Sequence, residues 1–209
     1  SGVDDSKLGT DSANVTVSVN TASSDDAFDD APGSVVAVTC ANDDVAGMTL
    51  SKNSMTIGEN GGQDTFTVVL TAQPVSNVVL DVSSSATAQA TVSPSTLTFT
   101  NANWNVTQTV TVTGVNDHLI GNHAATITVS VNDASSDDGF DAVADKTVAV
   151  TCTDNDFTVA YTAGANGSIV GTASQIVDSG TDGSTVTAQA GTGYHFVDWS
   201  DASTDNPRT

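Results

Sequence analysis

The chain has 209 residues, enough for one large domain or two small ones. Its 25 acidic and 4 basic residues give a formal net charge of −21. This charge excludes nucleic acids and anionic membrane surfaces as partners, because both are polyanions that attract Lys and Arg. No apolar stretch approaches the roughly 20 residues that cross a bilayer, so we expect no membrane span.

The residue usage predicts strands and turns rather than helices. Thr, Val, Ser and Asn are abundant, and every acidic residue except Glu59 is Asp, which is a poor helix former. No long window has a helical period. Hydrophobic residues make up 38% of the chain and aromatic residues only 5%, so the cores should consist of Val, Ile, Leu and Ala. We therefore expect an all-β protein.

The strongest signal is an internal repeat. An ungapped alignment pairs residues 15–44, VTVSVNTASSDDAFDDAPGSVVAVTCANDD, with residues 127–156, ITVSVNDASSDDGFDAVADKTVAVTCTDND. The copies are offset by 112 residues, which places Cys40 over Cys152.

The repeat divides the chain into three parts. Residues 1–44 are predicted to be the second half of one repeat, residues 45–156 a complete repeat, and residues 157–209 a different module. Since neither end carries a complete module, we expect the sequence to be a segment of a longer chain.

The complete repeat is predicted to contain seven strands, with Pro94 marking a bulge or an edge. The expected strands are 48–57, 65–72, 77–83, 90–100, 108–115, 124–131 and 146–153. Apolar and polar residues alternate cleanly in the last three. Seven short, half-buried strands in about 112 residues predict an immunoglobulin-like β-sandwich.

Cys40 and Cys152 occupy equivalent positions on the inward faces of their strands. We therefore predict two free thiols buried in separate cores, where each acts as a small hydrophobic residue. The alternative is a disulfide or a metal-binding pair, and a disulfide requires Cα atoms within about 7 Å.

Three separated motifs of the complete repeat resemble the Calx-β family of extracellular repeats. They are MTIGENGG at 55–62, STLTFTNANWNVTQTVTVTGVND at 95–117 and VAVTCTDND at 148–156. The resemblance implies calcium-binding sandwiches that occur in tandem in large bacterial surface and secreted proteins. The family often has an acidic residue after the loop that follows the fifth strand, where this chain has Ile120-Gly121-Asn122, and this difference weakens the expected ligand set.

The C-terminal module resembles the internalin B-type bacterial repeat, which implies a small β-grasp-like fold. The resemblance rests on YTAGANGSI at 161–169, Gln175, TVTAQ at 185–189 and GYHFVDWSD at 193–201. The aromatic residues of this module could form a platform for sugars, but we favour a role as its core. They are Tyr194, Phe196 and Trp199.

Successive strands are expected to run in opposite directions, so alternate loops should lie at the same end of the sandwich. The loop after the first strand, the loop after the fifth strand and the end of the seventh strand lie at one pole. They bring together Glu59, Asn116, Asp117, Asp154 and Asp156. Calcium takes six to eight oxygen ligands from flexible carboxylates and carbonyls, so we predict a calcium site at this pole. The alternative is that these acids form turns and are solvated.

Two further sets of acidic residues are candidate calcium ligands. Asp5, Asp43 and Asp44 form the corresponding set in the first repeat. Asp137 or Asp138, in the loop between the last two strands, should face the junction with that repeat. For this loop a solvated acidic segment is the favoured alternative.

No catalytic constellation stands out, because the three histidines have no zinc-binding spacing. We predict a non-enzymatic structural segment of a bacterial cell-surface or secreted protein (a stalk, adhesin or extracellular fibre) rigidified by calcium. The expected partners are neighbouring repeats of the same or identical chains, and a surface glycan or protein target. The alternative is a carbohydrate-binding accessory module of a secreted enzyme, which an exposed aromatic strip would favour.

Overall fold

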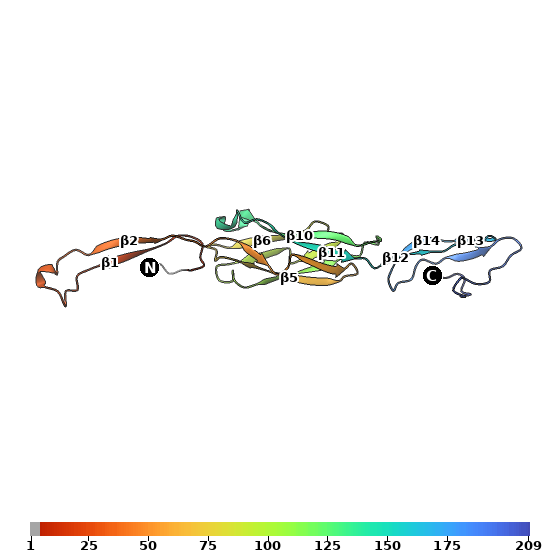
Figure 1. The fold of residues 1–209 in the computed structure, drawn as a ribbon, viewed down its shortest axis with the longest axis horizontal. Coiled ribbons are helices and arrows are strands. Elements are labelled where there is room, and N and C mark those ends of the chain that lie inside the picture. Colours follow the sequence, from red (N-terminus) through yellow and green to blue (C-terminus); the bar gives the residue numbers. More distant parts are fainter. Residues whose placement is uncertain (1–4) are drawn as a thin grey trace.

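The computed structural model describes residues 5–209 as three units in a row (Figure 1). The first four residues of the predicted half-repeat lie outside the described residues. The first unit is a two-stranded hairpin of β1 (Asp11–Val17) and β2 (Ser34–Cys40). A β-sandwich lies in the middle, and a smaller module of short strands follows it.

The sandwich consists of two sheets, as the sequence predicts. One sheet has the strand order β4 (Ser54–Gly58), β11 (Lys146–Thr153), β10 (His123–Val131), β6 (Val78–Ser84) and β8 (Thr96–Phe99). The other has the order β3 (Met48–Leu50), β5 (Gln63–Leu70), β9 (Gln108–Gly114) and β7 (Ala90–Ser93). All pairs are antiparallel except β4 with β11, which are parallel.

Two of the predicted strands are each divided between the two sheets. The first becomes β3, which pairs with β5, and β4, which pairs with β11. The fourth becomes β7 and β8, separated by Pro94, which has no N–H to donate to a ladder. At each crossing the inward-facing positions change from even to odd residue numbers, from Met48 to Met55 and Ile57 and from Ala90 to Leu97 and Phe99.

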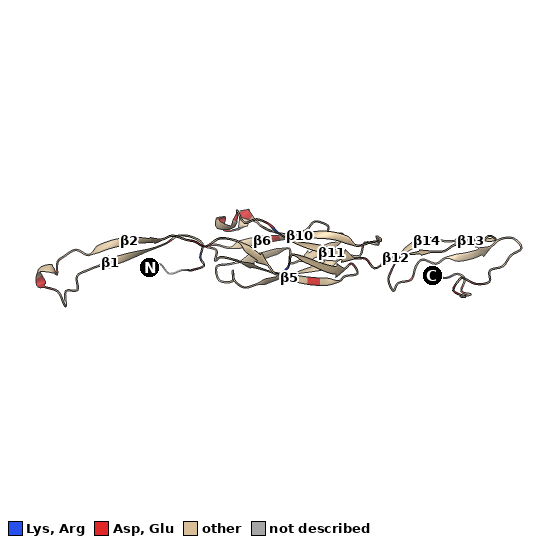
Figure 2. Cartoon of the chain, viewed as in Figure 1, with Lys and Arg blue, Asp and Glu red and all other residues tan. Residues whose placement is uncertain are grey.

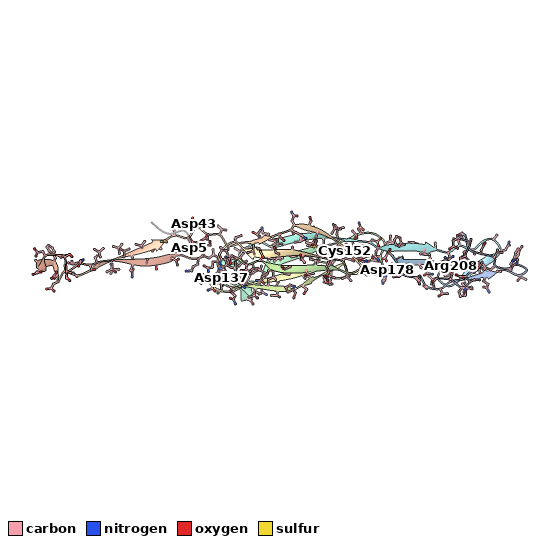
Figure 3. All side chains as sticks on the ribbon, turned by 90° about the horizontal axis from the view of Figure 1, so that it is seen from below. Asp5, Asp43, Asp137, Cys152, Asp178 and Arg208 are labelled. Carbon is pink, nitrogen blue, oxygen red and sulfur yellow. The ribbon has the colours of Figure 1, made fainter. Side chains whose placement is uncertain are left out.

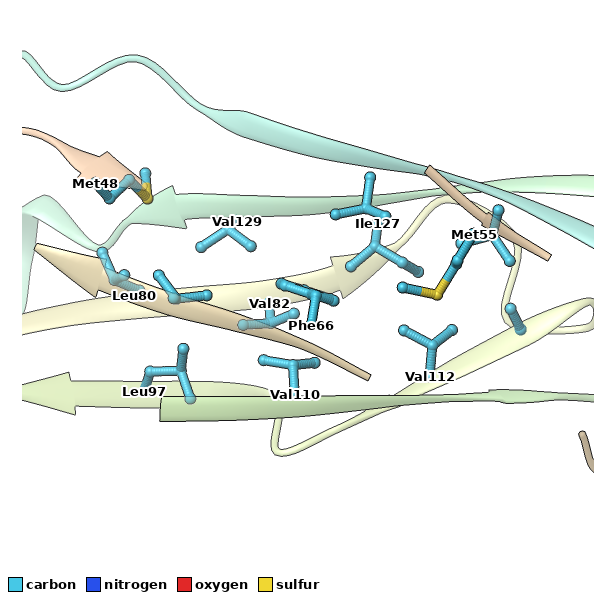
Figure 4. Close-up of a cluster of buried hydrophobic side chains, with 14 of the residues drawn as sticks. Met48, Met55, Phe66, Leu80, Val82, Leu97, Val110, Val112, Ile127 and Val129 are labelled. Carbon is cyan, nitrogen blue, oxygen red and sulfur yellow. The ribbon is translucent and has the colours of Figure 1, made fainter. Parts of the chain in front are cut away.

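The core lies between the sheets and consists of inward-facing aliphatic and aromatic side chains (Figure 4). Phe66 and Phe99 are at most 1% exposed, so the aromatic residues of the sandwich strands belong to the core. Phe140 is also fully buried, although it lies in a loop, in the 3-10 turn η3 (Asp138–Phe140) that follows η2 (Asp133–Ser135).

The N-terminal hairpin repeats β10 and β11 residue for residue. Asp11 pairs with Cys40 in the hairpin, and His123 pairs with Cys152 in the sandwich, so the two ladders have the same register. A 3-10 turn, η1 (Asp26–Phe28), corresponds to η3. No second sheet covers the hairpin in residues 5–209, so its apolar residues stay exposed.

The two cysteines therefore differ. Both thiols are free, and Cys152 is 1% exposed in the sandwich core, as predicted. The prediction of a buried Cys40 is wrong, because its strand belongs to the uncovered hairpin and the residue is only half-buried.

The C-terminal module contains two ribbons. β12 (Asp156–Ala160) pairs with β14 (Ser174–Asp178), and β13 (Gly167–Val170) pairs with β15 (Thr187–Ala190). The buried amide of Gln175 links the module internally, donating to the carbonyls of Thr172 and Ser184 at 2.8 Å. The helices of residues 5–209 are single 3-10 turns, and none could cross a membrane.

Candidate metal centre

The structure brings the predicted acidic pole together from three loops. Glu59 follows β4, Asn116 and Asp117 follow β9, and Asp154 to Asp156 follow β11. Three groups of side chains each have ligand atoms within 4.8 Å of one another. They are Glu59, Asp117 and His123; Glu59, Asp154 and Asp156; and His118, Asp156 and Asp178.

A tight glycine turn places Glu59 inside this pole. The amide of Gly62 donates to the carbonyl of Gly58 at 2.9 Å. A Cβ at Gly114 would lie 2.2 Å from the same carbonyl oxygen, so only glycine allows β9 to pass this close. The Glu59 side chain is 1% exposed, and its Oε1 accepts a hydrogen bond from the amide of Asn155 at 3.1 Å.

Asp154 is held in place by backbone amides. It accepts hydrogen bonds from the amide of Gly121 at 2.5 Å and the amide of Asp156 at 2.7 Å, which hold the pKa of its carboxyl below the ordinary value. Its own amide donates to the side chain of Asn122 at 2.9 Å. The Ile120-Gly121-Asn122 segment thus orients a predicted ligand, although it supplies no carboxylate.

Asp156 has the least compensated carboxylate of the pole. The residue is 6% exposed, and neither carboxylate oxygen has a hydrogen-bond partner. Burial, together with the neighbouring carboxylates of Asp178 and Glu59, raises the pKa of Asp156 to about 6. Both effects disfavour the charged form of the side chain.

Asp117 and His123 complete the cluster. The Oδ2 of Asp117 lies 3.4 Å from the Nδ1 of His123, and both atoms are buried without a well-formed hydrogen bond. The buried thiol of Cys152, in the adjoining core, donates to the carbonyl of Gln89 at 3.2 Å. Burial raises the pKa of this thiol, as do the charges of Glu59 and Asp117, so it stays protonated at neutral pH.

No Lys or Arg neutralises the pole, and Figure 2 shows how few basic residues the chain carries. Lys7 pairs with Asp11 at 3.0 Å, Lys52 with Asp64 at 2.6 Å and Arg208 with Asp201 at 2.9 Å. The fourth basic residue, Lys146, begins β11 and lies at the opposite end of that strand from the pole.

The orphaned atoms fit a hard cation. Buried oxygens of Asp117, Asn155 and Asp156 have no hydrogen-bond partner. Calcium binds such carboxylate and amide oxygens, and its charge would offset the repulsion among them. The residues that would hold it are Glu59, Asp117, Asp154 and Asp156.

Asp137 lies at the opposite end of the sandwich from Asp178 (Figure 3). It is buried, and its carboxylate accepts hydrogen bonds from the amides of Val75, Ser76 and Gly139 at 2.6, 2.7 and 2.9 Å. Burial acts to raise its pKa, but these bonds outweigh it and lower the pKa below the ordinary value. The side chain thus caps η3 and anchors the loop between β5 and β6.

Asp138 is exposed beside it. Asp5 and Asp43 lie near the same end of the sandwich (Figure 3), and they line a shallow hollow together with Asp44. Within residues 5–209, none of these four acids belongs to a close group of three metal-ligating side chains. Their roles in calcium binding, and that of Asp137, stay predictions.

Sequence reasoning missed three members of the acidic pole. They are His118 and His123, whose spacing gives no zinc motif, and Asp178, which belongs to the C-terminal module. The Nδ1 of His118 lies 2.8 Å from Asp178 Oδ1, and Asn116 Nδ2 donates to Asp178 Oδ2 at 2.5 Å. Burial raises the pKa of Asp178, but its contacts with Asp156, Asn116 and His118 give a net lowering.

In the C-terminal module, Phe196 and Trp199 pack together with Tyr161, whereas the prediction that Tyr194 belongs to the core is wrong, because its side chain is exposed. The ring of Trp199 makes edge contacts with Tyr161 and Phe196 at centroid distances of 5.7 and 5.5 Å, and Arg208 lies over it at 5.4 Å. Its Nε1 donates to the carbonyl of Asp205 at 2.8 Å. Tyr194 is 60% exposed at the edge of an open groove that the other aromatic rings line.

Among solved structures, the chain is similar to WR4, a C. elegans MSP family member, with 10% identity and a TM-score of 0.39 over 51% of this chain and 97% of that one. It is similar to the apo-form Calx CBD1 domain, with 15% identity and a TM-score of 0.37 over 53% and 100%. It is also similar to domains 4 and 5 of the S-layer protein SbsC, with 21% identity and a TM-score of 0.38 over 58% and 59%. No curated protein matches the chain. Residues 157–209 match the family model of the divergent InlB B-repeat domain, which confirms the predicted resemblance of this module.

Proposed function

We propose that this chain is a non-enzymatic spacer in a bacterial cell-surface or secreted protein, and that calcium stiffens it. The three units follow one another along a single axis (Figure 1), and the last of them matches the model of the divergent InlB B-repeat domain. In this role the chain would form part of a stalk, adhesin or extracellular fibre. Its partners would be neighbouring repeats and a surface target.

One observation carries the proposal. The acidic pole gathers buried carboxylates with no Lys or Arg side chain among residues 5–209 to balance them, at the joint between the sandwich and the C-terminal module. Uncompensated buried charges are costly, and a bound cation is the direct way to offset that cost. The ligands come from loops that also form this joint, so bound calcium would restrict the bending of the C-terminal module relative to the sandwich.

The test is thermal unfolding of the intact chain at constant ionic strength, with calcium, with magnesium and with a chelator. Calcium at 100 times its Kd adds about 2.7 kcal/mol per site to the free energy of unfolding. For a sandwich of this size that corresponds to a rise in Tm of roughly 10 °C. We expect this rise with calcium and a much smaller one with magnesium, which tolerates irregular carboxylate sites poorly.

Glu59→Gln removes one central carboxylate and should abolish most of the calcium-induced rise. Asp145→Asn is the matched control, because Asp145 is exposed just before β11 and the change in net charge is the same. An equal rise in both variants, or no rise in the unmodified chain, would exclude calcium binding at this pole.

Carbohydrate binding is the second candidate, and the exposed ring of Tyr194 beside the aromatic groove favours it. A glycan array probed with the intact chain tests this function. Tyr194→Ala should abolish any signal while leaving the calcium-dependent Tm unchanged, because Tyr194 lies outside the acidic pole.

A further inference from the structure

Asp178 belongs to the C-terminal module, yet its carboxylate is held by the sandwich. It is the last residue of β14, and both of its oxygens contact the loop after β9, through Asn116 and His118. The turn beyond it is also attached, since the amide of Ser179 donates to the carbonyl of Asn155 at 2.8 Å. Asp178 is therefore a side chain of one module that lies within the acidic pole of another.

The pairing of β12 with β14 places two acids face to face. Asp156 is the direct cross-strand partner of Asp178. Like charges opposite each other in an antiparallel pair are destabilising. The oxygens of Asp178 have polar partners, whereas those of Asp156 are buried and have none. The side chain of Asp156, which is 6% exposed and has no hydrogen-bond partner, thus lies close to a second carboxylate, and its ligand atoms group with those of Asp178 and His118 within 4.8 Å.

We propose that a second calcium ion binds between Asp156 and Asp178 and fastens the C-terminal module to the sandwich. Asp156 would be shared with the first site, since it also groups with Glu59 and Asp154. His118 and Asn116 would orient Asp178 from the sandwich side. This inference rests on the proposed calcium binding at the pole and adds a ligand that comes from the neighbouring module.

Isothermal titration of the intact chain with calcium tests the inference. Asp178→Asn keeps the shape of the side chain and should lower the stoichiometry by one ion, leaving the first site filled. Asp182→Asn is the matched control, because Asp182 is an exposed acid of the same module. Asp178→Glu restores a carboxylate and should recover the lost ion at reduced affinity, which excludes misfolding as the cause.

The outcomes separate the two proposals. If the unmodified chain binds no calcium, both fail. If it binds calcium and Asp178→Asn has the same stoichiometry, only the second ion is excluded. If zinc rather than calcium gives the Asp178-dependent step, the assignment of calcium is wrong and His118 acts as a ligand.

Small-angle scattering provides a readout that does not depend on stoichiometry. Calcium should narrow the range of radii of gyration that the unmodified chain samples, and Asp178→Asn should abolish that change. An unchanged calcium response in this variant would show that the module is fastened without Asp178.

Discussion

Phe140 and Phe28 allow the contribution of burial in the sandwich core to the free energy of unfolding to be measured within one molecule. They occupy equivalent positions in the internal repeat, each at the end of a 3-10 turn. Phe140 is 0% exposed and Phe28 is 62% exposed. The same substitution at the two positions therefore differs almost only in burial.

Phe140→Ala should lower the free energy of unfolding by about 3–5 kcal/mol, the usual cost of removing a buried phenyl ring and leaving a cavity. For a domain of about 100 residues this is a fall in Tm of at least roughly 12 °C. Phe28→Ala should change the stability of the sandwich by less than about 0.5 kcal/mol, as exposed substitutions do.

Scanning calorimetry of the intact chain measures both effects on the transition of the sandwich. Urea unfolding followed by far-ultraviolet circular dichroism gives an independent free energy. Equal losses in the two variants would refute the reasoning, because they would mean that the hairpin bearing Phe28 is packed as tightly as the sandwich.

Two further predictions concern Asp137 and Asp156. Asp137→Ala should lower the free energy of unfolding by about 3 kcal/mol, because it removes the charged acceptor of three hydrogen bonds, from the amides of Val75, Ser76 and Gly139. Asp25→Ala, at the equivalent exposed cap, should cost under about 1 kcal/mol in the same urea titration. In chelator, the raised pKa of Asp156 means that the folded state binds more protons than the unfolded state between pH 3.8 and about 6. The free energy of unfolding that Asp156 contributes therefore falls as the pH rises through this window. Asp156→Asn should reduce this pH dependence, measured as the urea midpoint between pH 4 and 7. If the urea midpoint depends on pH equally in the variant and in the unmodified chain, Asp156 is not the group with the raised pKa.

The parts of the fold that follow from a local period were predictable. The strand at Lys146–Thr153 has its predicted bounds, since alternating Val and Thr fix both its length and its inward face. The crossings between sheets at 51–53 and at Pro94 were not predictable, because the one-residue shift of the alternation at each of them is equally typical of a bulge within a single strand. The burial of Cys40 was also not predictable. The alternation of its strand correctly places it at the position equivalent to Cys152, but burial also needs a second sheet over the hairpin, which no local pattern reveals.

The candidate site divides in the same way. Glu59, Asp117 and Asp154 were found because alternating strand directions place their loops at one end. Asp178 was missed because its position depends on the pairing of β12 with β14 across an intervening strand. Asp137 was taken for a solvated acid, whereas it is the cap of a turn whose last residue, Phe140, points into the core.

The parallel pairing of β4 with β11 also determines how the sandwich would respond to force. The chain enters the sandwich ahead of β3 and β4 and leaves it after β11, so tension along the molecule pulls β4 and β11 in opposite directions. Since the two strands run the same way, this tension acts along their length and loads the five paired positions from Ser54–Ala149 to Gly58–Thr153 together. A ladder loaded in shear must break several hydrogen bonds at once, whereas a hairpin pulled open at one end breaks them one after another. The sandwich is thus oriented to resist extension along the axis on which the three units lie.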